Sequence, residues 1–202
     1  MVPFVLKNSF FEYQGKKLKC FYHKYNKTWK NERCIEIPIV LDKLIETKSN
    51  KILEIGNVLS HYIQINWQVI DKFEKPLIHS IINVDFCEYK TNNKFDLIIS
   101  ISTIEHIGFD EEILEPEKAL KALIKIKELL SDSGKAIITF PIGYNKYLDS
   151  YIKNNKFIFD RITYMYKIGP RKWIEKSFFD ERVKYGVPFQ CANGLVIGEI
   201  FK

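Results

Sequence analysis

Three carboxylates stand at the ends of three successive apolar segments of the chain. Glu54 lies in "LEIG", Asp71 ends "VID", and Asp85 ends "NVD". An acid that ends the second strand, about 20 residues beyond a glycine turn, is suited to hold the two hydroxyls of a ribose. Asp85 is followed by Phe86, so the acid suits an adenine amino group and the ring suits the base itself. Together these positions predict a ligand bound at the ends of neighbouring strands.

The first of these segments, "KILEIGNVLSHY" at residues 51–62, contains a single glycine. Gly56 would permit a tight turn and a close approach of the backbone to a ligand. The pattern GxGxxG is absent, which argues against a dinucleotide site and hence against a nicotinamide-dependent dehydrogenase. Taken alone, the segment is better explained as an ordinary strand that ends at a glycine. The prediction of a ligand site therefore depends on the acids that follow this segment.

The elements that must position these residues alternate between strand and helix patterns. Apolar runs typical of strands occupy 51–56, 67–73, 81–86, 95–102, 135–143 and 193–201, and an amphipathic helix is predicted over 117–130 with Gly134 as its cap. Residues 10–23 predict a small hairpin. A helix follows that starts or kinks near Pro38. The alternation predicts a Rossmann-like α/β fold, with a mainly parallel sheet and helices on both faces.

The bulk composition fits one domain over residues 1–202, with a hairpin and helix in 1–47 and a core in 48–202. The chain is 46% hydrophobic and has no Ser/Gly/Pro-rich linker. The four cysteines form no CxxC pair and no zinc spacing, so we expect free thiols, no metal site and a cytoplasmic location. No stretch reaches the roughly 18 apolar residues of a membrane span. The net charge of +6 comes from dispersed lysines.

The ordered set "LEIG", "VID", "NVD", "FDLIISISTIEHIG" and "LLSDSGKAIITFPIG" resembles the class I S-adenosylmethionine-dependent methyltransferases. The resemblance covers roughly residues 50–145, and the final "NGLVIGEIF" is similar to the terminal antiparallel strand of that family. It implies methyl transfer from S-adenosyl-L-methionine by in-line displacement. Where the family usually has further glycines in the first loop, this chain has Val58 and Ser60.

The resemblance also implies which residues hold the cofactor. The methionine part would lie on the first loop, the ribose on the second acid, the adenine on the third, and the methyl-transfer site along the loop after the fourth strand. The residues at these positions are Glu54, Gly56, Asn57, Asp71, Asp85, Phe86, Ser100, Ile101 and Ser102.

A general base is needed only if the acceptor loses a proton as it reacts. The candidates are His106, Glu105 and Tyr144. His106 has the titration range suited to the task. The alternative is that Glu105 and His106 simply begin the next helix, where an acid is favourable.

We expect segments outside the shared core to determine which acceptor binds. Residues 25–36 form either a lid or an N-terminal arm with Arg33 in a surface ion pair. Arg171, Lys172 and Trp173 form either a phosphate-binding set or a solvated loop around one buried ring. We expect a small-molecule, glycan or nucleotide-sugar-type acceptor. The alternatives are a nucleic-acid methyltransferase, which the dispersed lysines disfavour, and a non-catalytic adaptor. The oligomeric state is left open.

Overall fold

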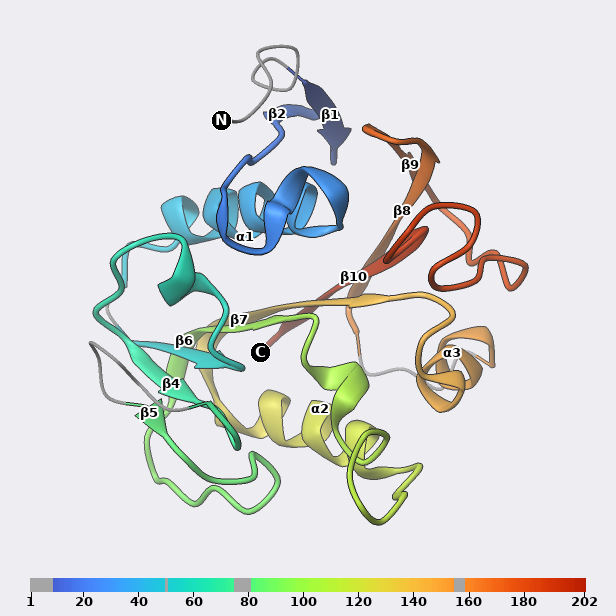
Figure 1. The fold of residues 1–202 in the computed structure, drawn as a ribbon. Helices are drawn as coiled ribbons and strands as arrows, with labels where there is room; N and C mark the ends of the chain where they lie inside the picture. The colour runs from blue at the N-terminus through green and yellow to red at the C-terminus, as the bar shows by residue number, and fades with distance from the viewer. Residues whose placement is uncertain (1–8, 50, 75–80, 155–158) are drawn as a thin grey trace.

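The computed structural model describes residues 9–49, 51–74, 81–154 and 159–202. Its centre is an eight-stranded sheet in the order β5-β4-β3-β6-β7-β10-β8-β9 (Figure 1). The strands are β3 (Ile52–Ile55), β4 (Gln68–Ile70), β5 (Ile81–Ile82), β6 (Phe95–Ile101), β7 (Leu130–Pro141), β8 (Arg161–Gly169), β9 (Lys172–Lys176) and β10 (Gly194–Phe201). Strands β3 to β7 are parallel, whereas β10 is antiparallel to both β7 and β8. The predicted Rossmann-like α/β sheet with a terminal antiparallel strand is confirmed.

The strand order reverses between β3 and β6. From β3 the chain runs outward through β4 to β5, and from β6 it runs the other way to β7. In open parallel sheets, ligands bind beyond the carboxyl ends of the strands at such a switch point. The fold therefore places a binding position at the ends of β3, β4 and β6.

Helices cover both faces of the sheet. Helix α1 (Arg33–Glu46) lies on one face, α2 (Lys118–Leu129) on the other, and α3 (Lys146–Lys153) follows β7 (Figure 1). Alternate residues of β6 explain the two cores, because side chains of a strand point to opposite faces. Leu97 and Ile99 pack with α1, and Ile98 packs with α2.

Of the two alternatives predicted for Pro38, a helix start there is wrong, because α1 begins at Arg33 and runs through the proline. A proline inside a helix removes one N–H and leaves the carbonyl four residues earlier without its usual partner. That carbonyl belongs to Cys34, and it accepts a hydrogen bond of 2.8 Å from the N–H of Phe21. The N-terminal segment thus satisfies the group that Pro38 leaves free.

The glycine predicted to cap the helix over 117–130 lies elsewhere. Helix α2 ends at Leu129, and strand β7 starts at the next residue, so Gly134 lies inside the strand. A Cβ at Gly134 would lie 2.6 Å from the carbonyl oxygen of Phe95. This glycine permits close packing of β7 on β6 rather than ending a helix. Residues 172–176 form strand β9, which pairs with β8.

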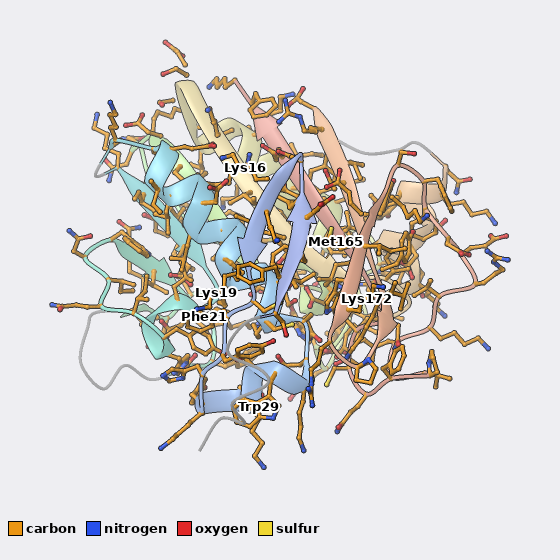
Figure 2. All side chains as sticks on the ribbon, turned by 90° about the horizontal axis from the view of Figure 1, so that it is seen from above. Lys16, Lys19, Phe21, Trp29, Met165 and Lys172 are labelled. Carbon is orange, nitrogen blue, oxygen red and sulfur yellow. The ribbon has the colours of Figure 1, made fainter. Side chains whose placement is uncertain are left out.

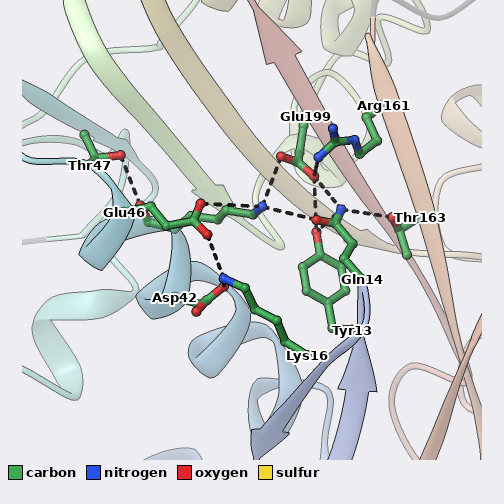
Figure 3. Close-up of polar contacts among 10 residues, drawn as sticks. Tyr13, Gln14, Lys16, Asp42, Glu46, Thr47, Arg161, Thr163 and Glu199 are labelled. Atoms are coloured by element: carbon green, nitrogen blue, oxygen red, sulfur yellow. Dashed lines mark hydrogen bonds and ion pairs between the residues drawn. The ribbon is translucent and has the colours of Figure 1, made fainter.

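The predicted N-terminal hairpin is formed by β1 (Phe10–Tyr13) and β2 (Lys16–Lys19). It lies between α1 and strands β8 and β9 (Figure 2). Its turn is held by a polar cluster around Glu199 of β10 (Figure 3). The carboxylate of Glu199 accepts hydrogen bonds from Gln14 at 2.6 Å and from the Tyr13 hydroxyl at 3.4 Å, and it pairs with Lys43 at 3.3 Å.

Three further facts bear on the site. All four cysteines are free thiols. Over the part of the chain that the structure describes, no group of three or more His, Cys, Asp or Glu side chains is arranged to hold a metal ion. In the same residues, no helix is long and apolar enough to cross a membrane.

Candidate functional site

A cavity of about 300 Å³ opens at the carboxyl ends of β3, β4 and β6. The sheet brings together there most of the residues predicted to bind a cofactor. Those that line the cavity are Gly56, Asn57, Asp71, Asp85, Phe86 and Ser102, together with the predicted base His106. The cavity thus coincides with the switch point of the strand order.

Gly56 is fixed as glycine by two independent constraints. Its φ of +82° is rarely adopted by residues with a side chain, and a Cβ there would lie 2.1 Å from Oγ1 of Thr103. Thr103 follows β6, so this contact joins the first loop to the loop after the fourth strand of the parallel set. Val58, by contrast, has φ −103°, which any residue adopts. The loop therefore needs only one glycine to make its turn.

Glu54 has a different role from the one expected. Its side chain is fully buried and is not part of the cavity wall. One carboxylate oxygen accepts hydrogen bonds from the N–H groups of Val58 at 3.0 Å and Leu59 at 2.7 Å. The other accepts from the indole N–H of Trp67 at 3.0 Å. Burial raises the pKa of Glu54, and these bonds oppose the shift. Glu54 shapes the loop instead of contacting a ligand.

Asp71 lines the cavity and also fixes the two loops beside it. Its carboxylate accepts hydrogen bonds from the N–H groups of Asn57 at 3.0 Å, Phe73 at 2.9 Å and Glu74 at 2.8 Å. A carboxylate has about four lone-pair sites, so three backbone donors leave room for one more. Asp71 can therefore hold the loops and still accept a hydrogen bond from a ligand hydroxyl.

Asp85 is held by lysines that the sequence did not single out. Lys72 lies 3.0 Å and Lys118 lies 2.8 Å from its Oδ2. Both lysines also reach Glu111, at 3.0 Å and 2.6 Å. Burial alone would raise the pKa of Asp85, but the two lysines outweigh it and lower the pKa to about 2. This four-residue network closes one end of the cavity, where Phe86 contributes an apolar wall.

The cavity is acidic although the whole chain is basic. Among the described residues, its wall contains one lysine, Lys72, and five carboxylates: Asp71, Glu74, Asp85, Asp110 and Glu111. Of these carboxylates, Asp85 and Glu111 pair with Lys72 and with Lys118, which is not part of the wall. Clefts lined by one sign of charge concentrate ligands of the opposite sign. Such a wall favours a cationic ligand and opposes the pyrophosphate of a dinucleotide.

Two of the three residues predicted from the loop after β6 do not reach the cavity. Ser100 is fully buried, and its hydroxyl has no hydrogen-bond partner among the described residues. Ile101 packs into the core under α1. Only Ser102 lines the cavity, with a φ of +39° that is uncommon outside glycine. Ser100 and Ile101 lie inside β6, whereas Ser102 follows the end of the strand, where the cavity opens.

His106 sits at the rim of the cavity in a polar cluster with Asp110 and Tyr144. Its Nδ1 lies 2.5 Å from Oδ2 of Asp110, and the Tyr144 hydroxyl donates to the same oxygen at 2.6 Å. Burial and then the bond to Asp110 raise the pKa of Tyr144, so this predicted base is a hydrogen-bond donor. Asp110 holds Nδ1, which leaves Nε2 of His106 for another partner. Glu105 lies on the Nε2 side of the ring, with its Oε1 3.7 Å from Nε2.

Glu105 lies in a buried acidic cluster behind the cavity. Its side chain is 1% exposed, it is not part of the cavity wall, and its Oε2 has no hydrogen-bond partner in the described residues. Burial raises the pKa of Glu105 well above the usual value, and the neighbouring Glu36 adds to the effect. Arg33 opposes it.

Arg33 is largely enclosed, with 14% of its side chain exposed, so the alternative of a surface ion pair is wrong. It pairs with Glu36, whose other carboxylate oxygen accepts hydrogen bonds from the hydroxyls of Ser102 and Thr139, both at 2.7 Å. The pair thus ties α1 to the ends of β6 and β7. None of the residues 25–36 belongs to the cavity wall. The segment instead packs on the loop after β3, where Tyr25 stacks on His61 with ring centroids 4.3 Å apart.

Replacing Glu105 with glutamine should stabilise the protein at alkaline pH. A carboxyl whose pKa is raised by folding stabilises below its unfolded pKa, and this contribution is lost as the pH rises through the folded pKa. Glutamine does not titrate. Near about pH 8 the melting temperature of Glu105→Gln should therefore exceed that of the wild type by roughly 2–4 °C, and the difference should shrink near about pH 4. The exposed Glu112→Gln is the control and should leave both melts unchanged. A lower melting temperature for Glu105→Gln at alkaline pH would refute the assignment.

The burial of each side chain decides between the alternatives for residues 171–173. Trp173 is 4% exposed within β9, so its ring is not available to stack on a ligand. Arg171 and Lys172 lie exposed at the β8–β9 turn, away from the cavity. Sequence reasoning missed Thr103, Asp110, Glu111 and Lys118. The only sequence pattern that could have identified one of them was the spacing of four residues between His106 and Asp110.

Comparisons with known proteins agree on the fold. A model of the family described as "Caenorhabditis protein of unknown function, DUF268" matches residues 37–184. A search of curated proteins finds no match. The chain is similar to the N-methyltransferase NodS from Bradyrhizobium japonicum WM9 in complex with S-adenosyl-L-homocysteine, with a TM-score of 0.55 and 12% identity over 85% of this chain and 87% of that one.

A second solved structure, a SAM-dependent methyltransferase from Archaeoglobus fulgidus, aligns with a TM-score of 0.52 and 14% identity over 83% of this chain and 93% of that one. At these identities the likeness concerns the fold. The resemblance to the methyltransferase fold expected from the sequence is confirmed.

Proposed function

This chain belongs to the DUF268 family, described as "Caenorhabditis protein of unknown function", and from its methyltransferase fold we propose that it transfers a methyl group from S-adenosylmethionine to a small-molecule or glycan acceptor. The observation that carries the proposal is the acidic cavity at the switch point of the sheet. S-adenosylmethionine, which supplies a methyl group already activated on a sulfonium, is a cation. NodS, which has this fold, is described as an N-methyltransferase.

The residues of the cavity fit such a cofactor. Gly56 lines the cavity and lets the first loop pack closely on Thr103 of the loop after β6. Asp71 keeps one acceptor site for a ribose hydroxyl. Phe86, with Val84 and Ile107 beside it in the wall, offers an apolar surface for an adenine ring.

The acceptor side of the site is assigned to the cluster around His106. Methyl transfer needs mainly alignment and exclusion of water, with a base only where the acceptor loses a proton. Asp110 fixes Nδ1 of His106, and Nε2 is then the atom that accepts a proton. The buried Glu105 lies beside that atom, with its Oε1 at 3.7 Å.

Transfer of a labelled methyl group tests this function. The protein should transfer tritiated methyl from S-adenosylmethionine into a small-molecule extract. His106→Ala should lower the rate by about 10²–10⁴-fold, the usual contribution of general base catalysis. Tyr144→Phe keeps the ring next to His106 and loses only the bond to Asp110, so its effect should be much smaller.

Unchanged turnover in His106→Ala would assign the histidine to structure. Transfer to nucleic acid rather than to small molecules would favour the nucleic-acid alternative. Absence of transfer to every fraction would favour the non-catalytic adaptor.

A further inference from the structure

A second concave site lies on the same edge of the sheet, beyond β7. It is a groove of about 490 Å³ between the end of β8 and the segment 178–193 that leads into β10. Figure 1 shows this segment looping beside β8 and β9, on the side of the sheet near α3. Its wall includes the rings of Tyr166 and Phe178 and the side chains of Lys167, Lys176, Arg182 and Lys184. The groove is larger than the acidic cavity and opposite to it in charge.

The positive charge of the groove resides on its lysines. Arg182 is paired with Asp180 through two hydrogen bonds of 2.8 Å and 2.7 Å, so these two charges compensate each other. Lys176 and Lys184 are exposed, and neither pairs with a carboxylate of the described residues. Lys167 lies over the rings of Trp173 and Phe189, at 5.7 Å and 5.5 Å from their centroids. Lys167 also donates to the carbonyl of Lys30 at 3.4 Å, so the ammonium groups of Lys176 and Lys184 remain for an anionic ligand.

The walls of the groove are held by buried polar groups. The Tyr166 hydroxyl donates to the carbonyl of Phe178 and accepts from the N–H of Asp180, both at 2.8 Å. The side chain of Asn193, 5% exposed, donates to the carbonyls of Phe189 at 2.8 Å and Lys184 at 3.2 Å. Lys184 is thus fixed at its backbone while its ammonium stays free. A preorganised groove of this kind loses less entropy on binding than a mobile surface loop would.

One wall of the groove also contacts the acceptor side of the candidate active site. A Cβ at Gly143, in the loop after β7, would lie 2.8 Å from both the N–H nitrogen of Tyr185 and the carbonyl oxygen of Val183. The ring of Tyr185 packs edge-on against Tyr144, with centroids 5.0 Å apart. Tyr144 is hydrogen-bonded to Asp110, the partner of His106. The segment that forms this wall is therefore linked to His106 through Tyr185, Tyr144 and Asp110.

We propose that this groove binds the phosphate groups of a nucleoside-diphosphate-type acceptor, with Lys176 and Lys184 on the phosphates and Phe178 against the ring. This inference rests on the proposed function and adds the class of acceptor to it. Lysine ammonium groups are common phosphate ligands. Phe178 is 54% exposed, and its apolar ring offers a face for a base or sugar. The acidic cavity repels such a ligand. The charges of the two sites therefore direct the cationic cofactor to the cavity and the anionic acceptor to the groove.

Titration of the full chain with uridine diphosphate and with inorganic pyrophosphate, followed by calorimetry, tests the proposal. Both should bind the wild type, uridine diphosphate more tightly because only it has a ring for Phe178. Lys176→Ala with Lys184→Ala should weaken both by about tenfold or more, since hydrogen bonds to charged groups are lost. Phe178→Ala should weaken only uridine diphosphate.

The matched control is Lys17→Ala with Lys121→Ala, which removes the same charge from two exposed lysines on β2 and α2. It should bind both probes as the wild type does. Equal binding by the Lys176/Lys184 variant and the wild type would overturn the proposal, and so would no binding by the wild type. Tighter binding of a short RNA, weakened by the same substitutions, would overturn the small-molecule assignment. S-adenosylhomocysteine binding is measured separately, so failure of the cofactor site is distinguished from failure of the groove.

Discussion

Gly56→Ala should abolish binding of S-adenosylhomocysteine and destabilise the protein. The alanine Cβ would stand 2.1 Å from Oγ1 of Thr103, and φ of +82° would place the residue in the left-handed region. The backbone conformation costs about 1–2 kcal/mol, and overpacking adds about 1–3 kcal/mol. Either the loop or Thr103 must move, and both line the cavity. Calorimetry measures the binding, and denaturant unfolding measures the stability.

Gly15→Ala is the matched control for this effect. Gly15 also has a positive φ, +75°, but a Cβ there would meet nothing within 4 Å. It should show only the backbone cost of about 1–2 kcal/mol and unchanged affinity for S-adenosylhomocysteine. If Gly56→Ala were no more harmful than Gly15→Ala in both measurements, the contact with Thr103 would not shape the site.

Glu36→Ala should cause a large loss of stability. Glu36 is fully buried, and its removal leaves Arg33 without its buried partner and two hydroxyls without their acceptor. Breaking a buried pair by removing one partner typically costs about 3–5 kcal/mol. Ser102, held by Glu36 at φ +39°, should also relax, so the affinity for S-adenosylhomocysteine should fall. Denaturant unfolding measures the first effect and calorimetry the second.

A control for this loss comes from the same helix. Glu46 pairs with Lys16 at 2.7 Å, but both side chains are 40% or more exposed. Exposed ion pairs contribute about 0–1 kcal/mol, so Glu46→Ala should change the free energy of unfolding by no more than that. Equal effects of Glu36→Ala and Glu46→Ala would show that the buried pair does not tie α1 to the sheet.

The sheet was predictable because its strands are short apolar runs that end in glycine or polar residues. Gly56, Asp71 and Asp85 were found because strand ends in a parallel sheet must meet at one edge. The path of helix α1 was not predictable, since it depends on an N–H of Phe21 that reaches Cys34 from outside the helix. The expectation that proline disrupts a helix rests on neighbouring residues alone and does not include a contact from a distant segment.

The detailed roles of the acids also lay beyond the sequence. Glu54 and Asp71 were both expected at strand ends, but Glu54 lies inside β3, and only Asp71, which follows β4, lines the cavity. The difference arises from Trp67 and the Val58–Leu59 backbone, which take up both oxygens of Glu54. Likewise, Asp85 differs from a free carboxylate mainly because Lys72 and Lys118 reach it, the second from α2. Such contacts join segments that no local pattern connects.

Calorimetric titration of the wild-type chain with S-adenosylhomocysteine shows whether the cavity at the ends of β3, β4 and β6 binds the cofactor product. We expect saturable binding at one site per chain. Asp71→Ala should weaken the affinity strongly, because the carboxylate both accepts from the ligand and fixes the loop at Asn57. No heat of binding at millimolar S-adenosylhomocysteine, from a chain that is folded by circular dichroism, would contradict the account.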